Sequence, residues 1–170
     1  EEQSAGLETI HTLIDAEEFS PVLVRGVTGS GKTELYIRAI DRIVGNGSSA
    51  IMLVPEIVLT PQMNARFSER FERVAIVHSR LSDGQRADIW KRAREGAYDV
   101  IIGPRSALFM PLPNLGLIIV DEEHEHTFKQ EQTPRYNARD CAVYIGHQRS
   151  IPVILGSATP SLESYTNAVS

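Results

Sequence analysis

The 170-residue sequence contains one cysteine, Cys141, and no long apolar run. A single cysteine excludes a disulfide framework and a cysteine-rich metal site, which makes a reducing, cytoplasmic compartment the default expectation. Apolar segments stay well short of the roughly 18 residues that a membrane span needs, and the acidic start EEQSAGLETI is unlike a signal peptide. Basic residues are not in excess either, because the formal net charge is −5, so any contact with nucleic acid has to be local.

The overall amino-acid composition is typical of one globular domain. Apolar residues make up 42% of the chain, and low-complexity segments, internal repeats and linkers are not evident. A chain of this length is long enough to bury a hydrophobic core.

Short β-branched runs alternate with helical patterns along the whole chain. The runs are continuous rather than alternating, which is typical of parallel strands covered on both faces. They predict strands at residues 21–26, 50–55, 73–78, 99–104, 115–121 and 151–157. Helices are predicted at residues 33–45, 60–71, 82–95, 138–148 and 161 to the end, and Ser82 with Gln85 forms a candidate capping box. This order predicts an α/β fold of three layers around a mainly parallel sheet.

The segment GVTGSGKT follows the first predicted strand and opens the first of these predicted helices. It matches the phosphate-binding pattern G-x-x-x-x-G-K-[ST], in which glycines let backbone amides turn toward phosphate oxygens. Lys32 is expected to reach the β- and γ-phosphates of ATP, and the Thr33 hydroxyl to hold Mg²⁺. A dinucleotide-binding loop is disfavoured, because Glu34 stands where that pattern needs its third glycine. The predicted nucleotide-binding residues of this loop are Gly26, Thr28, Gly29, Ser30, Gly31, Lys32 and Thr33.

Four ionisable residues, Asp121, Glu122, Glu123 and His124, follow the apolar run LGLIIV. Such a cluster at the end of a buried strand is costly unless something binds it, and Mg²⁺ is a natural counter-charge. We expect this strand to neighbour the one before the phosphate loop, with Asp121 holding the metal and Glu122 activating the attacking water. A zinc site at His124, Glu125 and His126 is a weaker interpretation, because no further set of ligands is visible.

Two later segments are ambiguous when judged from their residues alone. The run LGSATPS, residues 155–161, is a turn before a helix, with serine or threonine as a cap and Pro160 in the first turn. Residues 125–140 form either an exposed loop whose aromatic residues anchor the core, or a surface that stacks on bases. In the second interpretation Phe128 and Tyr136 stack, and Lys129, Arg135 and Arg139 lie near phosphates.

These segments occur together and in order with LVPEIVLTPQ and GPRSALF. Over essentially the whole chain, the combination resembles the first RecA-like lobe of the PriA family, the superfamily-2 replication-restart helicases also called primosomal proteins N′. The phosphate loop is shared by many NTPases, whereas VPEIVLTPQ with DEEH and the following KQEQTPRYNARD is much more specific. The resemblance implies a RecA-like ATPase lobe that couples ATP hydrolysis to 3′→5′ movement on DNA during primosome assembly.

The resemblance also assigns roles to individual residues. Gln3 matches a glutamine that reads adenine, and His124 matches a residue that couples the acids to the rest of the lobe. Gly156, Ser157, Ala158 and Thr159 match the motif that links hydrolysis to movement. Segments that grip the DNA backbone correspond to residues 55–60 and 103–106, with Arg105 and Ser106 as the expected contacts. Residues 128–140 match an aromatic-rich loop that is thought to connect DNA binding with ATP hydrolysis.

Three positions depart from the family pattern. Pro104 replaces a small or hydroxyl residue and removes a backbone donor. Thr133 and Pro134 stand where a tryptophan is common, and Asn137 replaces a histidine. Stacking is therefore expected to depend on Phe128 and Tyr136.

The resemblance covers only one part of the family's architecture. It implies a second lobe with arginine fingers, an N-terminal DNA-binding part and a zinc part, so the chain is expected to be one lobe of a longer protein and nearly inactive alone. Forked or single-stranded DNA, primosome proteins and single-stranded DNA-binding protein are its implied partners, and ATP and Mg²⁺ its cofactors. Three alternatives stay open: a kinase or other P-loop NTPase, an interaction module with a vestigial nucleotide site, and a restriction- or chromatin-type translocase lobe.

Overall fold

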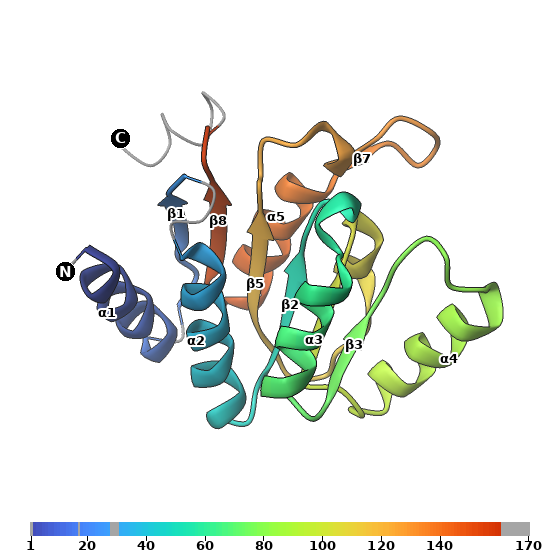
Figure 1. The fold of residues 1–170 in the computed structure, drawn as a ribbon, viewed down its shortest axis with the longest axis horizontal. Helices are drawn as coiled ribbons and strands as arrows, with labels where there is room; N and C mark the ends of the chain where they lie inside the picture. The colour runs from blue at the N-terminus through green and yellow to red at the C-terminus, as the bar shows by residue number, and fades with distance from the viewer. Residues whose placement is uncertain (1, 17, 28–30, 161–170) are drawn as a thin grey trace.

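The computed structural model describes residues 2–16, 18–27 and 31–160, and within them all six predicted strands form one parallel sheet (Figure 1). The pairing between neighbouring strands is parallel throughout. In spatial order the strands are β1 Pro21–Arg25, β8 Val153–Ser157, β5 Leu115–Asp121, β2 Ser49–Leu53, β4 Val100–Gly103 and β3 Val74–Ile76.

Helices cover both faces of this sheet, which confirms the three-layer prediction. One buried cluster joins the sheet to α1 Glu2–Asp15, α2 Lys32–Gly45 and α3 Pro61–Arg70. A second cluster joins the opposite face to α4 Asp83–Arg94 and α5 Ala138–Arg149. In Figure 1, α2 and α3 lie in front of the strands and α5 lies behind them.

Strand β2 shows why the apolar runs are continuous rather than alternating. All five of its residues are buried, with Ala50 and Met52 in the first cluster and Ile51 and Leu53 in the second. Because successive side chains point to opposite faces, a strand between two helical layers needs apolar residues at every position.

Helix starts follow their local sequence signals. Ser82 and Gln85 form the predicted capping box at the start of α4. Thr60 caps α3 by accepting a hydrogen bond from the Met63 amide, and Pro61 occupies the first turn. The helix predicted from residue 161 onward lies outside the described residues.

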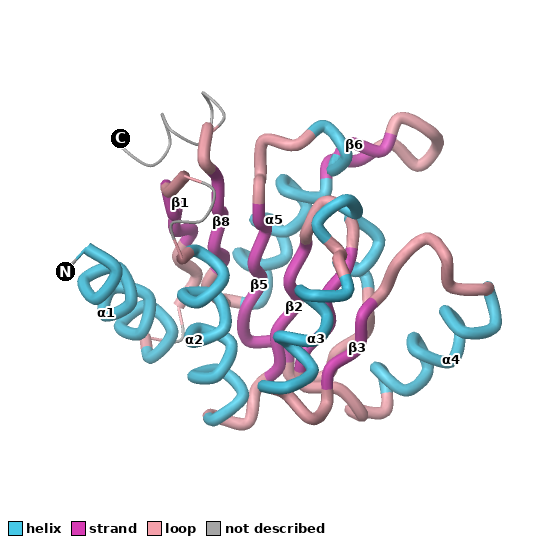
Figure 2. The backbone as a smooth tube through the Cα atoms, viewed as in Figure 1, coloured by secondary structure: helices cyan, strands magenta, loops and turns pink. Residues whose placement is uncertain are grey.

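Several elements were missed at the sequence level. These are α1, three short 3-10 helices at Glu56–Val58, Arg105–Phe109 and His126–Phe128, and a small hairpin of β6 Lys129–Gln130 and β7 Tyr136–Asn137. Figure 2 shows this hairpin beyond the carboxyl ends of the main strands. No helix within the described part of the chain is both long and apolar enough to span a membrane.

The fold matters for function because every main strand ends at one edge of the sheet. The phosphate loop after β1, the acids after β5 and the 157–160 segment after β8 therefore meet there. Ligands of parallel α/β sheets bind at this carboxyl edge.

Candidate nucleotide-binding site and adjoining hairpin

The phosphate loop ends in a turn that only glycine adopts easily. Gly31 has φ 89°, in the left-handed region, and directly precedes the first residue of α2. The first amides of a helix have no intrahelical acceptor and carry partial positive charge, so they can bind an anion. Thr28, Gly29 and Ser30 lie outside the described residues. Gln3 belongs to α1, but its side chain is likewise outside the described part of the chain.

Lys32 links the phosphate loop to the acidic cluster. Its ammonium nitrogen lies 2.7 Å from the Gly26 carbonyl oxygen and 3.1 Å from Glu122 Oε1. The Lys32 side chain is 9% exposed and that of Glu122 is 21% exposed, so the pair lies in a partly desolvated crevice. Two residues that are 90 positions apart in sequence are thus brought together.

The strand that carries the acids is not the direct neighbour of β1. The sequence predicts adjacent strands, but β8 lies between β1 and β5 and pairs with both. The Gly26 amide also donates to the Ser157 carbonyl at 3.1 Å, which ties the start of the phosphate loop to the end of β8. Strand β8 therefore lies between the two strands that lead to the phosphate loop and to the acids.

Asp121 is the last residue of β5 and is only 8% exposed. Burial raises the pKa of its carboxyl group, and the charge of Glu122 adds to this rise. A hydrogen bond from the Tyr36 hydroxyl to Asp121 Oδ1, at 2.9 Å, opposes the rise in pKa. Tyr36 was missed at the sequence level, although its place three residues after Thr33 puts both on one side of α2.

Thr33 and Asp121 line the same hollow, which has a volume of about 510 Å³. The hollow continues along α3 and the segment before it, where its lining includes Thr60, Gln62 and Arg66. A hydroxyl and a carboxylate oxygen are ligands that Mg²⁺ prefers, so the residues present fit this ion. Among the described residues, no group of three or more His, Cys, Asp and Glu side chains is arranged to hold a metal ion.

The turn after Asp121 packs against the segment after β8. Glu122 adopts the left-handed region with φ 50°, and its Oε2 accepts a hydrogen bond of 3.4 Å from the Ala158 amide. His124 Nδ1 and Ser157 Oγ share a hydrogen bond of 2.7 Å. Ser157 Oγ also accepts from the Thr159 amide at 3.1 Å. The water-activating candidate is thus joined to the segment that the family resemblance assigns to coupling.

Glu123 contacts Arg139 in the first turn of α5, directly after the hairpin. Its side chain is fully buried, and Arg139 Nη1 lies 3.2 Å from Glu123 Oε2. Arg139, which is 13% exposed, also bonds to Asp140 at 2.8 Å. Arg139 was predicted near DNA phosphates, but its guanidinium here serves two carboxylates.

The aromatic residues of the hairpin region divide between core and surface. Phe128 is 1% exposed and belongs to the core beside α5, so it offers no free face to a base. This burial corrects the expectation that Phe128 shares in stacking, and it matches the alternative in which an aromatic residue anchors the loop. Tyr136 is half-buried, and its ring meets Phe109 edge-on with centroids 5.2 Å apart. Phe109 is 51% exposed and was missed at the sequence level.

Arg105 fixes the hairpin to the short helix Arg105–Phe109. Its Nη1 donates to the Thr127 carbonyl at 2.9 Å and to the Lys129 carbonyl at 3.1 Å. Ser106 lies in the same short helix and is half-buried. Lys129 and Arg135 are exposed, and Arg135 donates to the Glu131 carbonyl at 3.1 Å.

Two of the unusual positions have local structural roles. The Pro104 carbonyl accepts from the Ala107 amide at 2.8 Å, at the start of the short helix. Asn137 caps α5, because its side chain accepts from the Arg139 amide at 3.0 Å. The Thr133–Pro134 peptide bond is cis.

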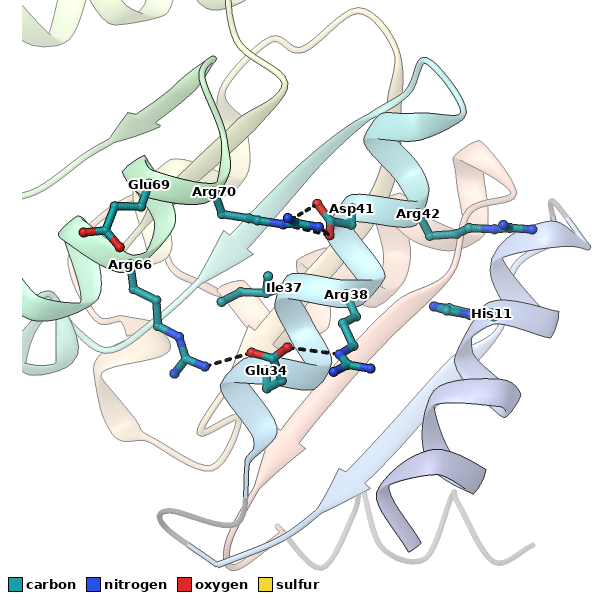
Figure 3. Close-up of a pocket in the computed structure, with 9 residues that line it drawn as sticks. All are labelled: His11, Glu34, Ile37, Arg38, Asp41, Arg42, Arg66, Glu69 and Arg70. Carbon is teal, nitrogen blue, oxygen red and sulfur yellow. Dashed lines mark hydrogen bonds and ion pairs between the residues drawn. The ribbon is translucent and has the colours of Figure 1, made fainter. Parts of the chain in front are cut away.

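A second hollow, with a volume of about 750 Å³, lies between α1, α2 and α3 (Figure 3). Its floor includes Ile37, and its rim carries paired charges. Glu34 bonds to both Arg38 and Arg66, and Arg70 pairs with Asp41. The arginines of this groove therefore form ion pairs along its rim.

Comparisons with known proteins agree with this geometry. A family profile described as DEAD/DEAH box helicase matches residues 4–168. The chain is 49% identical over 169 residues to the replication restart protein PriA of Bacillus subtilis, covering 99% of this chain and 21% of that protein. It is 50% identical over 171 residues to the replication restart protein PriA of Chlamydia pneumoniae, covering 99% of this chain and 23% of that protein. The chain thus spans about a fifth of the length of these curated relatives.

Solved structures share the fold. A structure of RecG bound to a three-way DNA junction superposes with a TM-score of 0.71 at 26% identity, covering 98% of this chain and 22% of that one. The Pyrococcus furiosus Hef helicase domain gives a TM-score of 0.62 at 20% identity, covering 96% of this chain and 34% of that one. The second likeness concerns the fold alone.

Proposed function

The chain belongs to the DEAD/DEAH box helicases, and from that premise we propose that it is the ATP-binding lobe of a DNA helicase that acts in replication restart. The observation that carries this proposal is the Lys32–Glu122 contact of 3.1 Å beside a hollow lined by Thr33 and Asp121. This arrangement places three groups at one edge of the sheet: the Lys32 ammonium group for phosphate, Thr33 and Asp121 as candidate metal ligands, and Glu122 as the candidate base.

The chemistry follows from the charges in this crevice. Lys32 neutralises Glu122, and phosphate oxygens would compete for the same ammonium group. A triphosphate that draws Lys32 away leaves the Glu122 carboxylate free to orient water and accept its proton. Thr33 and Asp121 would hold Mg²⁺, which would neutralise negative charge on the phosphates when bound. Glu122 and His124 contact the 157–159 segment, which offers a route by which the state of the nucleotide reaches β8.

The finer assignments are carried by the family resemblance. We propose movement in the 3′→5′ direction, a second lobe that supplies arginine fingers, primosome proteins as partners, and a cytoplasmic location at the replication fork. The DNA contacts we propose are the aromatic pair of half-buried Tyr136 and exposed Phe109, and Lys129, Arg135, Arg105 and Ser106 near phosphates. Arg105 can serve both the hairpin carbonyls and a phosphate, because a guanidinium has five N–H donors.

Nucleotide binding is the first test. Titration of the chain with a fluorescent ATP analogue in Mg²⁺ is expected to show binding that Lys32→Ala abolishes. Lys91→Ala, which removes an exposed lysine on α4, is the matched control and should bind like the wild type. Unchanged affinity in Lys32→Ala would remove the phosphate-loop assignment.

Dependence on DNA is the second test. In a protein that joins this chain to a second lobe, forked DNA should stimulate ATP hydrolysis, and Tyr136→Ala or Arg135→Ala should reduce the stimulation. Tyr144→Ala, which alters an exposed tyrosine on α5, is the control. A rate of ATP hydrolysis that no DNA increases would favour a kinase or another NTPase. The chain alone is expected to turn ATP over slowly, and rapid turnover would contradict the need for a second lobe.

A further inference from the structure

Tyr36 is buried to an extent that is unusual for a tyrosine with a polar hydroxyl. Its side chain is 0% exposed, at a position in α2 one turn after Thr33. A buried hydroxyl needs a hydrogen-bond partner, and Tyr36 donates to Asp121 Oδ1 at 2.9 Å. The two residues are 85 positions apart, so the bond joins the helix after the phosphate loop to the strand that carries the acids.

Gly156 provides the space for this hydroxyl. In the sheet, Gly156 of β8 lies directly beside Asp121 of β5. A Cβ atom on Gly156 would lie 1.7 Å from the Tyr36 hydroxyl oxygen, 2.9 Å from its ring carbon Cζ and 3.2 Å from Asp121 Oδ1. Non-bonded atoms do not approach as closely as 1.7 Å, so the tip of Tyr36 occupies the position that any other side chain at 156 would need.

From this geometry we infer that Tyr36 is a positioning residue for the metal-binding carboxylate, with Gly156 as the cradle that lets it reach Asp121. The phenol holds Oδ1 of Asp121, which leaves the other carboxylate oxygen available to a metal ion, and Asp121 lines the hollow shared with Thr33. Hydrogen bonds behind a metal ligand fix its orientation and commonly contribute about 10- to 100-fold to metal affinity. This inference rests on the proposed function, since it concerns the same nucleotide site.

The arrangement also places Gly156 of β8 in contact with the tip of Tyr36. A movement of β8 toward Asp121 would push against the Tyr36 hydroxyl, and a movement of Asp121 would pull on it. Tyr36 of α2 therefore contacts both β5, through Asp121, and β8, at Gly156.

The test separates metal binding from nucleotide binding. Affinity for a fluorescent ATP analogue is measured in EDTA and at increasing Mg²⁺ for the wild type and for Tyr36→Phe, which keeps the ring and removes the hydroxyl. We expect Tyr36→Phe to need roughly 10-fold more Mg²⁺ for half of the metal-dependent gain in affinity. Its affinity in EDTA should stay close to that of the wild type.

A matched control and a second variant sharpen the result. Tyr98→Phe removes the hydroxyl of a half-buried tyrosine outside the crevice and should leave the Mg²⁺ dependence unchanged. Gly156→Ala should reproduce the Mg²⁺ defect by displacing Tyr36. In the double variant, Tyr36→Phe should partly restore the thermal stability that Gly156→Ala loses, because it removes the hydroxyl oxygen that the new methyl group would meet.

An NMR experiment on the wild-type protein tests how near the metal lies to Tyr36. With nucleotide present, Mn²⁺ should broaden the signals of the Tyr36 ring at lower concentrations than those of the Tyr98 ring.

The outcomes distinguish the two proposals. Mg²⁺-dependent binding in the wild type with an unchanged Mg²⁺ requirement in Tyr36→Phe overturns the positioning role and leaves the nucleotide site intact. Unbroadened Tyr36 signals would likewise overturn it. A wild-type protein that binds no nucleotide at any Mg²⁺ concentration overturns the proposed function and this inference together.

Discussion

Replacing Arg139 by alanine gives the strongest test of how the acidic segment is held. Arg139 Nη1 lies 3.2 Å from Oε2 of Glu123, whose side chain is 0% exposed. The substitution removes a guanidinium from beside a buried carboxylate and retains the carboxylate. Removing one partner of such a pair costs much more than an exposed ion pair contributes, because a buried charge loses its counter-charge.

The size of the effect follows from this burial. We expect Arg139→Ala to lower the free energy of unfolding by about 3 kcal/mol, the lower end for a buried pair, since Arg139 keeps some access to water. For a domain of this size, that loss lowers the melting temperature by roughly 6–12 °C.

Urea unfolding followed by circular dichroism measures this loss, and Arg135→Ala is the matched control. Arg135 is exposed and bonds to the Glu131 carbonyl, so its removal should change stability by less than about 0.5 kcal/mol. A loss below about 1 kcal/mol for Arg139→Ala would refute the reasoning, because it would mean that the Glu123 carboxylate finds equal solvation without the guanidinium. The result also bears on DNA binding, since reduced DNA stimulation in Arg139→Ala would report a disturbed fold as much as a lost phosphate contact.

Three further predictions concern packing and pH. Phe128→Ala should cost about 3–5 kcal/mol in urea unfolding, because its ring is fully buried, and a loss near zero would contradict its core role. Gly146→Ala should cost about 1–3 kcal/mol, because the new methyl group would lie 2.2 Å from a Val153 methyl carbon where α5 meets β8, and calorimetry would detect it. Hydrogen bonding from the Ser79 side chain, and then from the Ser79 amide at 2.7 Å from Glu56 Oε1, holds the pKa of Glu56 below its ordinary value of 4.5. The stability from Glu56 is therefore complete above that ordinary pKa and is lost as the pH falls through the lower folded pKa, and Glu56→Gln should flatten this part of the acid-unfolding curve.

The sheet could be predicted from the sequence because its strands need apolar residues on both faces. Ile51 and Met52 are consecutive, yet they belong to opposite cores. Such runs are short, unbroken and bounded by turns, so their number and direction follow from local pattern alone. The capping box at Ser82 and Gln85 was predictable for the same reason, since its signal spans four residues.

The order of the strands was less accessible to sequence reasoning. Nothing local in residues 151–157 indicates that β8 inserts between β1 and β5. That placement depends on helical layers formed by distant segments. The same limit applies to α1, which packs on α2 through residues such as Ile10 and Ile14 that form no long apolar stripe.

The nucleotide site was predictable where chemistry and spacing coincide within one segment. Lys32 and Glu122 were each identified from their own motif, and the structure brings them to 3.1 Å. Tyr36 was missed, and Phe128 was wrongly expected to stack on bases. In both cases the sequence around a single aromatic residue does not show which distant residue it contacts. Tyr36 finds its partner 85 residues away, and Phe128 packs beside α5, whose residues follow it in the chain.

The turn at Glu122 explains how one acidic segment can face two sites. Because Glu122 has φ 50°, consecutive side chains leave the backbone in different directions: Glu122 toward Lys32, Glu123 toward Arg139. The Glu123 amide also donates to the Gly156 carbonyl at 3.0 Å, so this turn is anchored to β8. A displacement of the backbone at this turn would therefore affect both the Lys32–Glu122 contact and the buried Glu123–Arg139 pair. One peptide unit separates the Glu122 carboxylate, which is proposed to activate water, from the Glu123 carboxylate, which pairs with Arg139 in the helix that directly follows the hairpin.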